Sequence, residues 1–77
     1  MKGSDTMAYF EEMQMKVYTK YTFYYYRDTN VFTIRYQGER NHYRIEDDMS
    51  LFGCGEHKAM GAEETERFKE FKRVVLK

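Results

Sequence analysis

The clearest pattern along the chain is the alternation of side chains in residues 15–26, a stretch rich in Val, Thr, Tyr and Phe. These residue types suit the pleated, half-buried surface of a β-strand. The odd positions include Val17 and Phe23 and form the more apolar set, whereas the even positions include Lys16 and Tyr24. Because successive side chains of a strand point to opposite faces, we expect one long strand whose odd positions face the core.

Two further strands are expected to follow, separated by short turns. The first turn lies at residues 27–30, where Asp and Asn bond their own backbone and Asn tolerates left-handed geometry. The second strand covers residues 31–37, Gly38 opens the next turn by supplying a positive φ, and the third strand covers residues 41–46. The side chains expected to point inward are Phe32, Ile34, Tyr36, Tyr43 and Ile45. These strands would form an antiparallel meander.

Three other segments give weaker signals. Residues 1–6 are expected to form a flexible N-terminal arm. Residues 8–14 place three apolar side chains on one helical face, which predicts a short helix, with an extension of the first strand as the alternative. Residues 47–61 contain three glycines, so we expect a flexible loop there, with at most a short strand at residues 51–52.

The last segment, residues 62–76, has the pattern of an amphipathic helix. Phe68, Phe71 and Val75 recur at spacings of three and four residues. A sheet with one apolar face and a helix with one apolar stripe cover each other. We therefore predict a single small α+β domain over residues 7–77, in which an antiparallel meander of three to four strands carries one C-terminal helix on one face. The helix should contact Val17, Phe23, Phe32, Ile34 and Ile45.

Composition narrows the class of protein. The chain has 77 residues, no net charge, 18% aromatic residues and eight tyrosines, so it is expected to fold in spite of its few aliphatic residues. Tyr and Met should replace aliphatic side chains in the core. A single cysteine excludes an internal disulfide and fits a reducing, cytoplasmic location. No apolar run approaches the ~20 residues of a membrane span, and the start has no signal-peptide pattern.

The face of the sheet opposite the helix is the main candidate for function. It should present Lys16, Tyr18, Lys20, Thr22, Tyr24, Tyr26, Thr33, Arg35, His42 and Arg44. A solvated face is the simplest interpretation, but exposed aromatic patches generally mark contact surfaces. We therefore expect a non-enzymatic binding module that regulates or inhibits a partner protein. Its anchors would be Tyr18, Lys20, Tyr24, Tyr26, Arg35 and Arg44, because Tyr and Arg are favoured at protein interfaces.

Two alternative functions are binding of nucleic acid by the same face and a catalytic or metal site at a cysteine. The same cations and rings could bind single-stranded nucleic acid, although the sequence pI of 6.7 counts against it. Cys54 and His57, three residues apart and next to glycines, could form a nucleophile pair or half of a metal site. The simpler interpretation there is a small buried thiol beside an exposed histidine in a turn, and no cofactor or metal is expected. The acidic residues between positions 46 and 64 lack regular calcium-loop spacing.

Two further expectations concern the oligomeric state of the chain and the kind of protein that it resembles. An exposed edge strand could pair with a second copy and give a homodimer. The small chain, rich in Tyr and Met and without a catalytic motif, resembles the small accessory proteins of bacteriophages in its composition.

Overall fold

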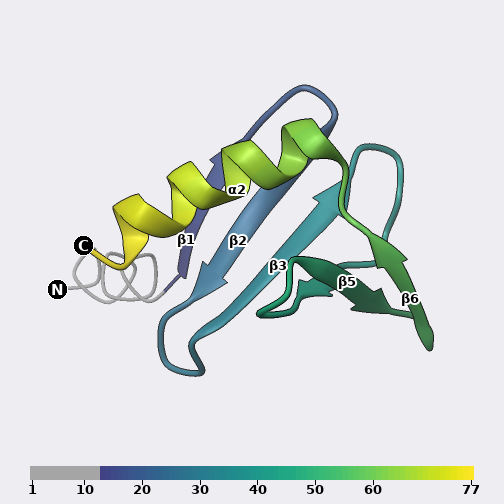
Figure 1. The fold of residues 1–77 in the computed structure, drawn as a ribbon, viewed down its shortest axis with the longest axis horizontal. Coiled ribbons are helices and arrows are strands. Elements are labelled where there is room, and N and C mark those ends of the chain that lie inside the picture. The colour runs from purple at the N-terminus through teal and green to yellow at the C-terminus, as the bar shows by residue number, and fades with distance from the viewer. Residues whose placement is uncertain (1–12) are drawn as a thin grey trace, which may run out of the picture.

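A computed structural model describes residues 13–77 as a sheet of six antiparallel strands with one helix across one face (Figure 1). Each strand pairs with its neighbours in sequence, so the strand order is β1-β2-β3-β4-β5-β6. The elements are β1 (Met13–Val17), β2 (Tyr21–Tyr26), β3 (Val31–Tyr36), β4 (Tyr43–Ile45), β5 (Ser50–Gly53), β6 (Glu56–Ala59) and α2 (Ala62–Val75). The predicted α+β class and antiparallel meander are confirmed, but the predicted three to four strands are too few.

The predicted strand over residues 15–26 is in fact a hairpin. β1 ends at Val17, the chain reverses at Thr19 and Lys20, and the Tyr18 amide donates a 2.8 Å hydrogen bond to the Tyr21 carbonyl. The turn contains no Gly, Pro, Asn or Asp, the residues that usually mark a reversal. The alternating pattern therefore continued through it without a visible break.

This reversal inverts the predicted faces of β1. Met15 pairs with Tyr24 and Val17 pairs with Thr22, so odd residues of β1 share a face with even residues of β2. Met15 and Val17 consequently point away from the helix, with 48% and 66% of their surface exposed. The expectation that they face the core is wrong, and so is the expected contact between Val17 and the helix. In β2 the prediction holds, because the odd residues are buried.

The next two reversals follow the sequence signals. Asn30 and Gly38 adopt positive φ angles of 56° and 86° in the turns after β2 and β3. Ile34 and Ile45 are buried in β3 and β4 as predicted. Tyr43 lies on the same side but is only partly buried, and packs against the edge of the core.

The segment from residue 47 to 61 contains the second error, because it holds a hairpin in place of the expected flexible loop, although the short strand considered at residues 51–52 is part of β5. β5 and β6 are joined by Cys54 and Gly55, whose φ angles of 53° and 75° fit a tight two-residue turn. Gly53 lies against β4, and a Cβ at that position would stand 2.8 Å from the Tyr43 ring. The hairpin was missed because β6 has the fully exposed sequence Glu-His-Lys-Ala, which lacks an apolar alternation.

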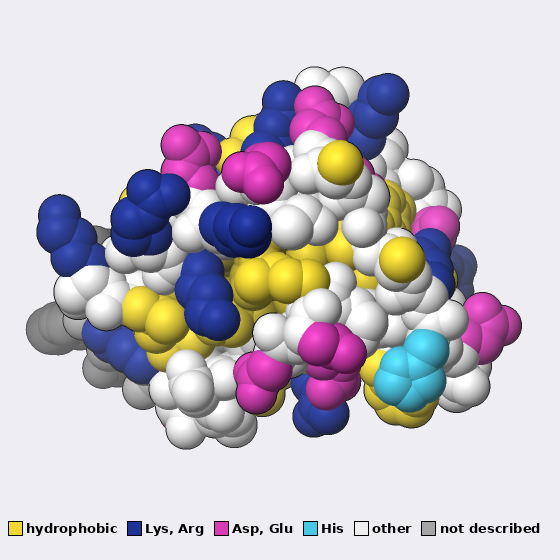
Figure 2. Space-filling model, viewed as in Figure 1, with side chains coloured by type: hydrophobic (Ala, Val, Ile, Leu, Met, Phe, Trp, Pro, Cys, Tyr) yellow, Lys and Arg dark blue, Asp and Glu magenta, His cyan; other side chains and the backbone are white. Residues whose placement is uncertain are grey.

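Helix α2 confirms the prediction for the C-terminal segment. Phe68 and Phe71 are buried against the sheet, and Val75 packs at the margin of the same core. The rings of Phe23 and Phe71 are stacked with centroids 5.9 Å apart, and the Phe32 ring meets Phe68 edge-on at 5.1 Å. Figure 2 shows the apolar seam between α2 and the sheet, with charged side chains on the outer side of the helix.

The predicted N-terminal arm and residues 8–12 of the predicted short helix lie outside the described residues. The last two positions of that predicted helix, residues 13 and 14, belong to β1, in agreement with the strand alternative. Within residues 13–77 no helix has the length and apolar character needed to cross a membrane.

Candidate docking face of the sheet

The surface of the sheet opposite α2, hereafter the outer face, is defined by strand register. Residues paired across neighbouring strands point to the same side, and α2 occupies the side of Phe23 and Ile34. The opposite side therefore carries Met15, Val17, Thr22, Tyr24, Tyr26, Val31, Thr33, Arg35, Arg44, Phe52 and His57. Within the part of the chain that the structure describes, no helix lies over this face (Figure 1).

Four of the six predicted anchors lie together on the outer face. Tyr24 and Tyr26 come from β2, and Arg35 and Arg44 come from β3 and β4. Thr33, which pairs with both Tyr24 and Arg44, connects the three strands. The predicted outward direction of the even positions in β2 is therefore correct, although Thr22 is buried on that side.

Tyr18 and Lys20 do not belong to the outer face. The Tyr18 ring lies on the helix side, 5.5 Å from the Tyr21 ring, and the guanidinium of Arg67 stands 4.4 Å from its centroid. Lys20 is exposed in the turn between β1 and β2. Lys16, expected on the outer face, pairs with Phe23 and also lies on the helix side. Lys16 and Tyr18 were misplaced because the reversal after β1 changes which face the even positions occupy, and Lys20 because it lies in the reversal itself.

An aromatic row runs along the centre of the outer face. The Tyr24 and Tyr26 rings are nearly parallel, with centroids 6.4 Å apart and an angle of 13°. The His42 ring lies 4.8 Å from Tyr24 and stands 3.3 Å from the Thr33 hydroxyl through Nδ1. These contacts set three aromatic rings side by side on the partly exposed outer face.

Sequence reasoning missed the second aromatic contact of this face. Phe52 of β5 and His57 of β6 are directly paired, and their rings lie 4.6 Å apart. Phe52 is 38% exposed, which is unusual for a phenylalanine in so small a domain. His57 was assigned to a loop and Phe52 to a loop with a short strand at residues 51–52, and recognition of the two-residue turn at Cys54 and Gly55 would have placed both on the sheet.

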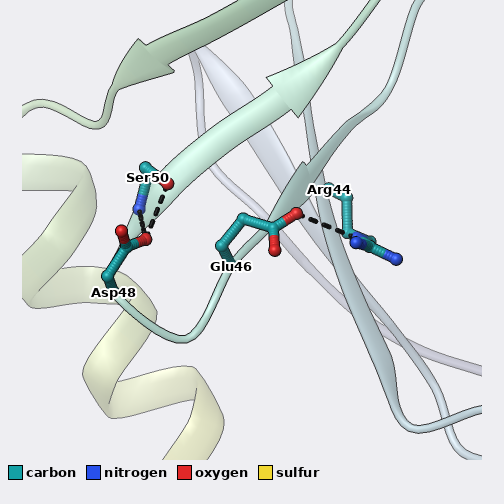
Figure 3. A network of polar contacts seen from close by, with 4 residues as sticks. All are labelled: Arg44, Glu46, Asp48 and Ser50. Carbon is teal, nitrogen blue, oxygen red and sulfur yellow. Dashed lines mark hydrogen bonds and ion pairs between the residues drawn. The ribbon is translucent and has the colours of Figure 1, made fainter.

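The two cations of the outer face differ in their partners. Nε of Arg44 lies 3.0 Å from a Glu46 carboxylate oxygen (Figure 3), so Arg44 has an ion-pair partner within the chain. Arg35 donates to the backbone carbonyl of Glu39 at 3.2 Å and forms no ion pair with a carboxylate of residues 13–77. Burial together with the nearby Arg35 charge lowers the pKa of His42 below 6.5. Arg35 is therefore the cation with most charge available to a ligand.

The Cys54 and His57 segment forms the tip and one strand of the β5–β6 hairpin. Cys54 is exposed at the tip of the β5–β6 hairpin, so the expected buried thiol is wrong. His57 is exposed as expected, but it belongs to β6 and not to a turn. Among residues 13–77, no three His, Cys, Asp or Glu side chains are arranged to hold a metal ion.

The acidic segment before β5 has a local structural role. One oxygen of the Asp48 carboxylate accepts hydrogen bonds from the Ser50 amide at 3.1 Å and from the Ser50 hydroxyl at 2.6 Å (Figure 3). These two bonds lower the pKa of Asp48 below its ordinary value. Asp48 thus stabilises the turn that leads into β5.

Comparison of the chain with models of protein families, with curated proteins and with solved structures found no match. The function therefore has to be inferred from the outer face itself.

Proposed function

We propose that the protein is a small non-enzymatic binding module that regulates or inhibits a partner protein by occupying part of its surface. The observation that carries this proposal is the row of adjacent aromatic rings on the outer face, next to a cation without a carboxylate partner in the described chain. Tyr and Arg are the residues that contribute most often to binding energy at protein interfaces. Tyr24, Tyr26 and Arg35 would be the central anchors.

The apolar surroundings of these anchors support the same proposal. Met15, Val17 and Phe52 are all exposed on the outer face. A standard interface covers about 800 Å² on each partner, with an aromatic centre and a polar rim. The chain exposes 5,602 Å² in total, so an interface of standard size would take up a modest part of its surface. The mixed apolar and aromatic centre fits a protein surface better than bulk solvent.

The proposed partner surface should carry a carboxylate opposite Arg35. Arg44 is paired with Glu46 and would lie at the rim, where a charge pair adds little affinity. Arg35 has a planar guanidinium that can bind a carboxylate through two parallel hydrogen bonds. Specificity would come from this pair, and most of the affinity from burial of the tyrosine rings.

The test is recovery of the partner from an extract of the source cells with the immobilised protein and its variants. Tyr24→Ala and Arg35→Ala should each lower partner affinity at least tenfold, which corresponds to about 1.4 kcal/mol. Arg73→Ala is the matched control, because Arg73 lies exposed on α2 and away from the outer face. Equal recovery by wild type and by both outer-face variants would rule out this surface as the docking face.

A second function is favoured by one specific observation, the parallel stacking of Tyr24 and Tyr26. Paired rings near a free Arg can bind successive bases of a single-stranded nucleic acid. The discriminating measurement is fluorescence anisotropy of labelled single-stranded oligonucleotides at low and moderate salt. Nucleic-acid affinity should fall steeply with salt because phosphate contacts release counterions. If no oligonucleotide raises the anisotropy at low salt, this alternative is excluded.

A further inference from the structure

Strand β1 is an edge of the sheet whose backbone offers a regular set of hydrogen-bonding groups. Within residues 13–77, β1 pairs with β2 alone. The bond from the Tyr18 amide to the Tyr21 carbonyl closes the hairpin, and hydrogen-bonded pairs alternate from that point along the ladder. The N–H and C=O groups of Lys16 therefore point towards β2. Those of Met15 and Val17 point away from β2, towards the open edge.

The two edges of the sheet differ in how they discourage pairing. In β6 all four residues are exposed, and Glu56 and Lys58 place charges along the strand. Charged side chains of this kind protect an edge against association with another strand. β1 carries a single charged residue among its described positions, Lys16, and the residues whose backbone groups face outward, Met15 and Val17, are apolar with 48% and 66% of their surface exposed. Of the two edges of the described sheet, β1 therefore has fewer charges and more apolar surface to offer to another strand.

We propose that two copies of the chain pair through antiparallel β1 strands around a two-fold axis at Met15, joining two sheets into one. In this register Met15 pairs with the partner's Met15, and the outward backbone groups of both strands bond to each other. The Met15 and Val17 side chains then lie at the centre of a doubled outer face. This dimer is independent of the proposed docking function.

Charge selects this register over its neighbour. With the axis at Met15, Lys16 stands opposite the partner's Gln14, a neutral side chain. If the axis moved to Lys16, the two lysines would face each other directly, and like charges in that position are destabilising. The register centred on Met15 also pairs all five residues of β1, the largest number that the strand allows.

The surface on the helix side of β1 also favours pairing with the β1 strand of a second copy of the chain. A groove between β1 and α2 is lined by Lys16, Tyr18, Glu70, Phe71 and Val74. Val74 is 67% exposed, and the last turns of α2 reach the edge formed by β1 (Figure 1). Lys16 and Glu70 form no ion pair with other residues of 13–77. Pairing of two β1 edges would bring two such grooves, each with one cation and one anion, against each other.

Cysteine cross-linking tests both the dimer and its register. In a Cys54→Asn background, which keeps a residue suited to positive φ in the turn, Met15→Cys should form a disulfide-linked dimer with oxidised glutathione. Paired residues around the axis would have Cα atoms ~5.5 Å apart, within the range of a disulfide. Ala59→Cys, on the opposite edge strand, is the matched control and should stay mainly monomeric. Equal or greater cross-linking of Ala59→Cys would overturn the proposal.

Sedimentation velocity provides the second, independent measurement. Wild type should change from monomer to dimer as its concentration rises, and a monomer up to ~1 mM would refute the dimer. Met15→Pro removes an amide that already points away from β2, so the β1–β2 ladder is retained. This variant should weaken dimerisation at least tenfold, whereas Ala59→Pro should not. Circular dichroism verifies that both variants fold, and the cross-linking result decides the matter if Met15→Pro does not.

Discussion

The two faces of the sheet use the same residue type, tyrosine, in opposite ways. On the helix side, Tyr21 and Tyr25 keep only 3% and 5% of their surface exposed. The hydroxyl of Tyr21 accepts a 3.3 Å hydrogen bond from Arg67, and that of Tyr25 donates to Asn30 at 3.0 Å. On the outer face, Tyr24 and Tyr26 stack on each other and stay partly exposed. Four tyrosines of one strand thus alternate between packing the domain and forming its open surface.

The difference shows that exposure, and not residue type, separates the structural from the candidate functional rings. A tyrosine combines a large apolar ring with a polar hydroxyl, so it suits a buried position with a hydrogen-bond partner and an interface equally well. Helix α2 decides between the two, because it covers one face and leaves the other open. Variants that affect one face while sparing the other should therefore separate stability from binding.

The largest difference in stability is expected between two side-chain truncations on opposite faces of the sheet. Phe68→Ala removes a ring that is 98% buried between α2 and the sheet, and should lower the free energy of unfolding by about 3–5 kcal/mol. Tyr24→Ala removes a partly exposed ring of the outer face and should cost about 1 kcal/mol or less. Urea unfolding followed by circular dichroism measures both values.

The same pair has opposite expected effects on binding. At temperatures where Phe68→Ala remains folded, it should retain partner affinity, whereas Tyr24→Ala should lose it. If both variants destabilised the domain equally, the outer face would be part of the structural core and the comparison of the two faces would fail.

A smaller effect on stability is expected from removal of a single hydroxyl group that forms a hydrogen bond between the sheet and the helix. The Tyr36 hydroxyl donates a 3.1 Å hydrogen bond to the Glu64 carboxylate on α2. Tyr36→Phe should lower the free energy of unfolding by about 1 kcal/mol, because it deletes this partly buried bond. Tyr26→Phe, the matched change on the outer face, should leave stability nearly unchanged. Chemical denaturation of both variants at neutral pH makes the comparison.

The same hydroxyl gives a pH-dependent signature. Burial and the adjacent Glu64 charge raise the pKa of Tyr36 above 10.0. The folded state therefore holds the phenol proton more tightly than the unfolded state does, and this contribution to stability is lost as the pH rises above 10. Tyr36→Phe should show less loss of stability than wild type over that alkaline range. An identical alkaline profile for both proteins would show that another group is responsible.

The sequence predicted those parts of the fold in which local pattern and burial agree. The stripe of Phe68 and Phe71 specified α2 and its buried face, and the alternation in β2 placed Tyr24 on the outer face. The prediction failed at the turn after Val17, because Thr19 and Lys20 carry no turn signal. There the reversal depends on the pairing of β1 with β2, which is a tertiary interaction that a local pattern does not contain.

Prediction of the candidate site from the sequence was limited in the same way. Arg35 and Arg44 were placed correctly because they lie in strands with clear alternation. Tyr18 was misplaced because its position depends on the reversal after β1 and on contact with Arg67, which is distant in sequence. His57 was missed because an edge strand like β6 needs few apolar residues, and Phe52, within the short strand considered at residues 51–52, was not assigned to the outer face. The location of Phe52 follows from pairing of β5 with β4, and that of His57 from pairing of β6 with β5, which holds the buried Leu51.

The smallest expected effect concerns the protonation of His42 on the outer face. Burial, and secondarily the charge of Arg35, lowers the pKa of His42 below its ordinary value of 6.5. The folded state thus binds a proton on this ring less readily than the unfolded state. The linked stability is complete above pH 6.5 and declines as the pH falls from 6.5 towards the pKa of the folded state.

Titration of the ring by NMR measures the shift directly. Wild type should show a His42 pKa below 6.5, and Tyr24→Ala should raise it because removal of the adjacent ring reduces burial. Arg35→Ala should also raise it, by a smaller amount, because a nearby positive charge is removed. A pKa at or above 6.5 in wild type would mean that His42 is fully solvated and does not pack on Tyr24. The aromatic row would then lack one of its fixed contacts, and the outer face would be less ordered than the face under α2.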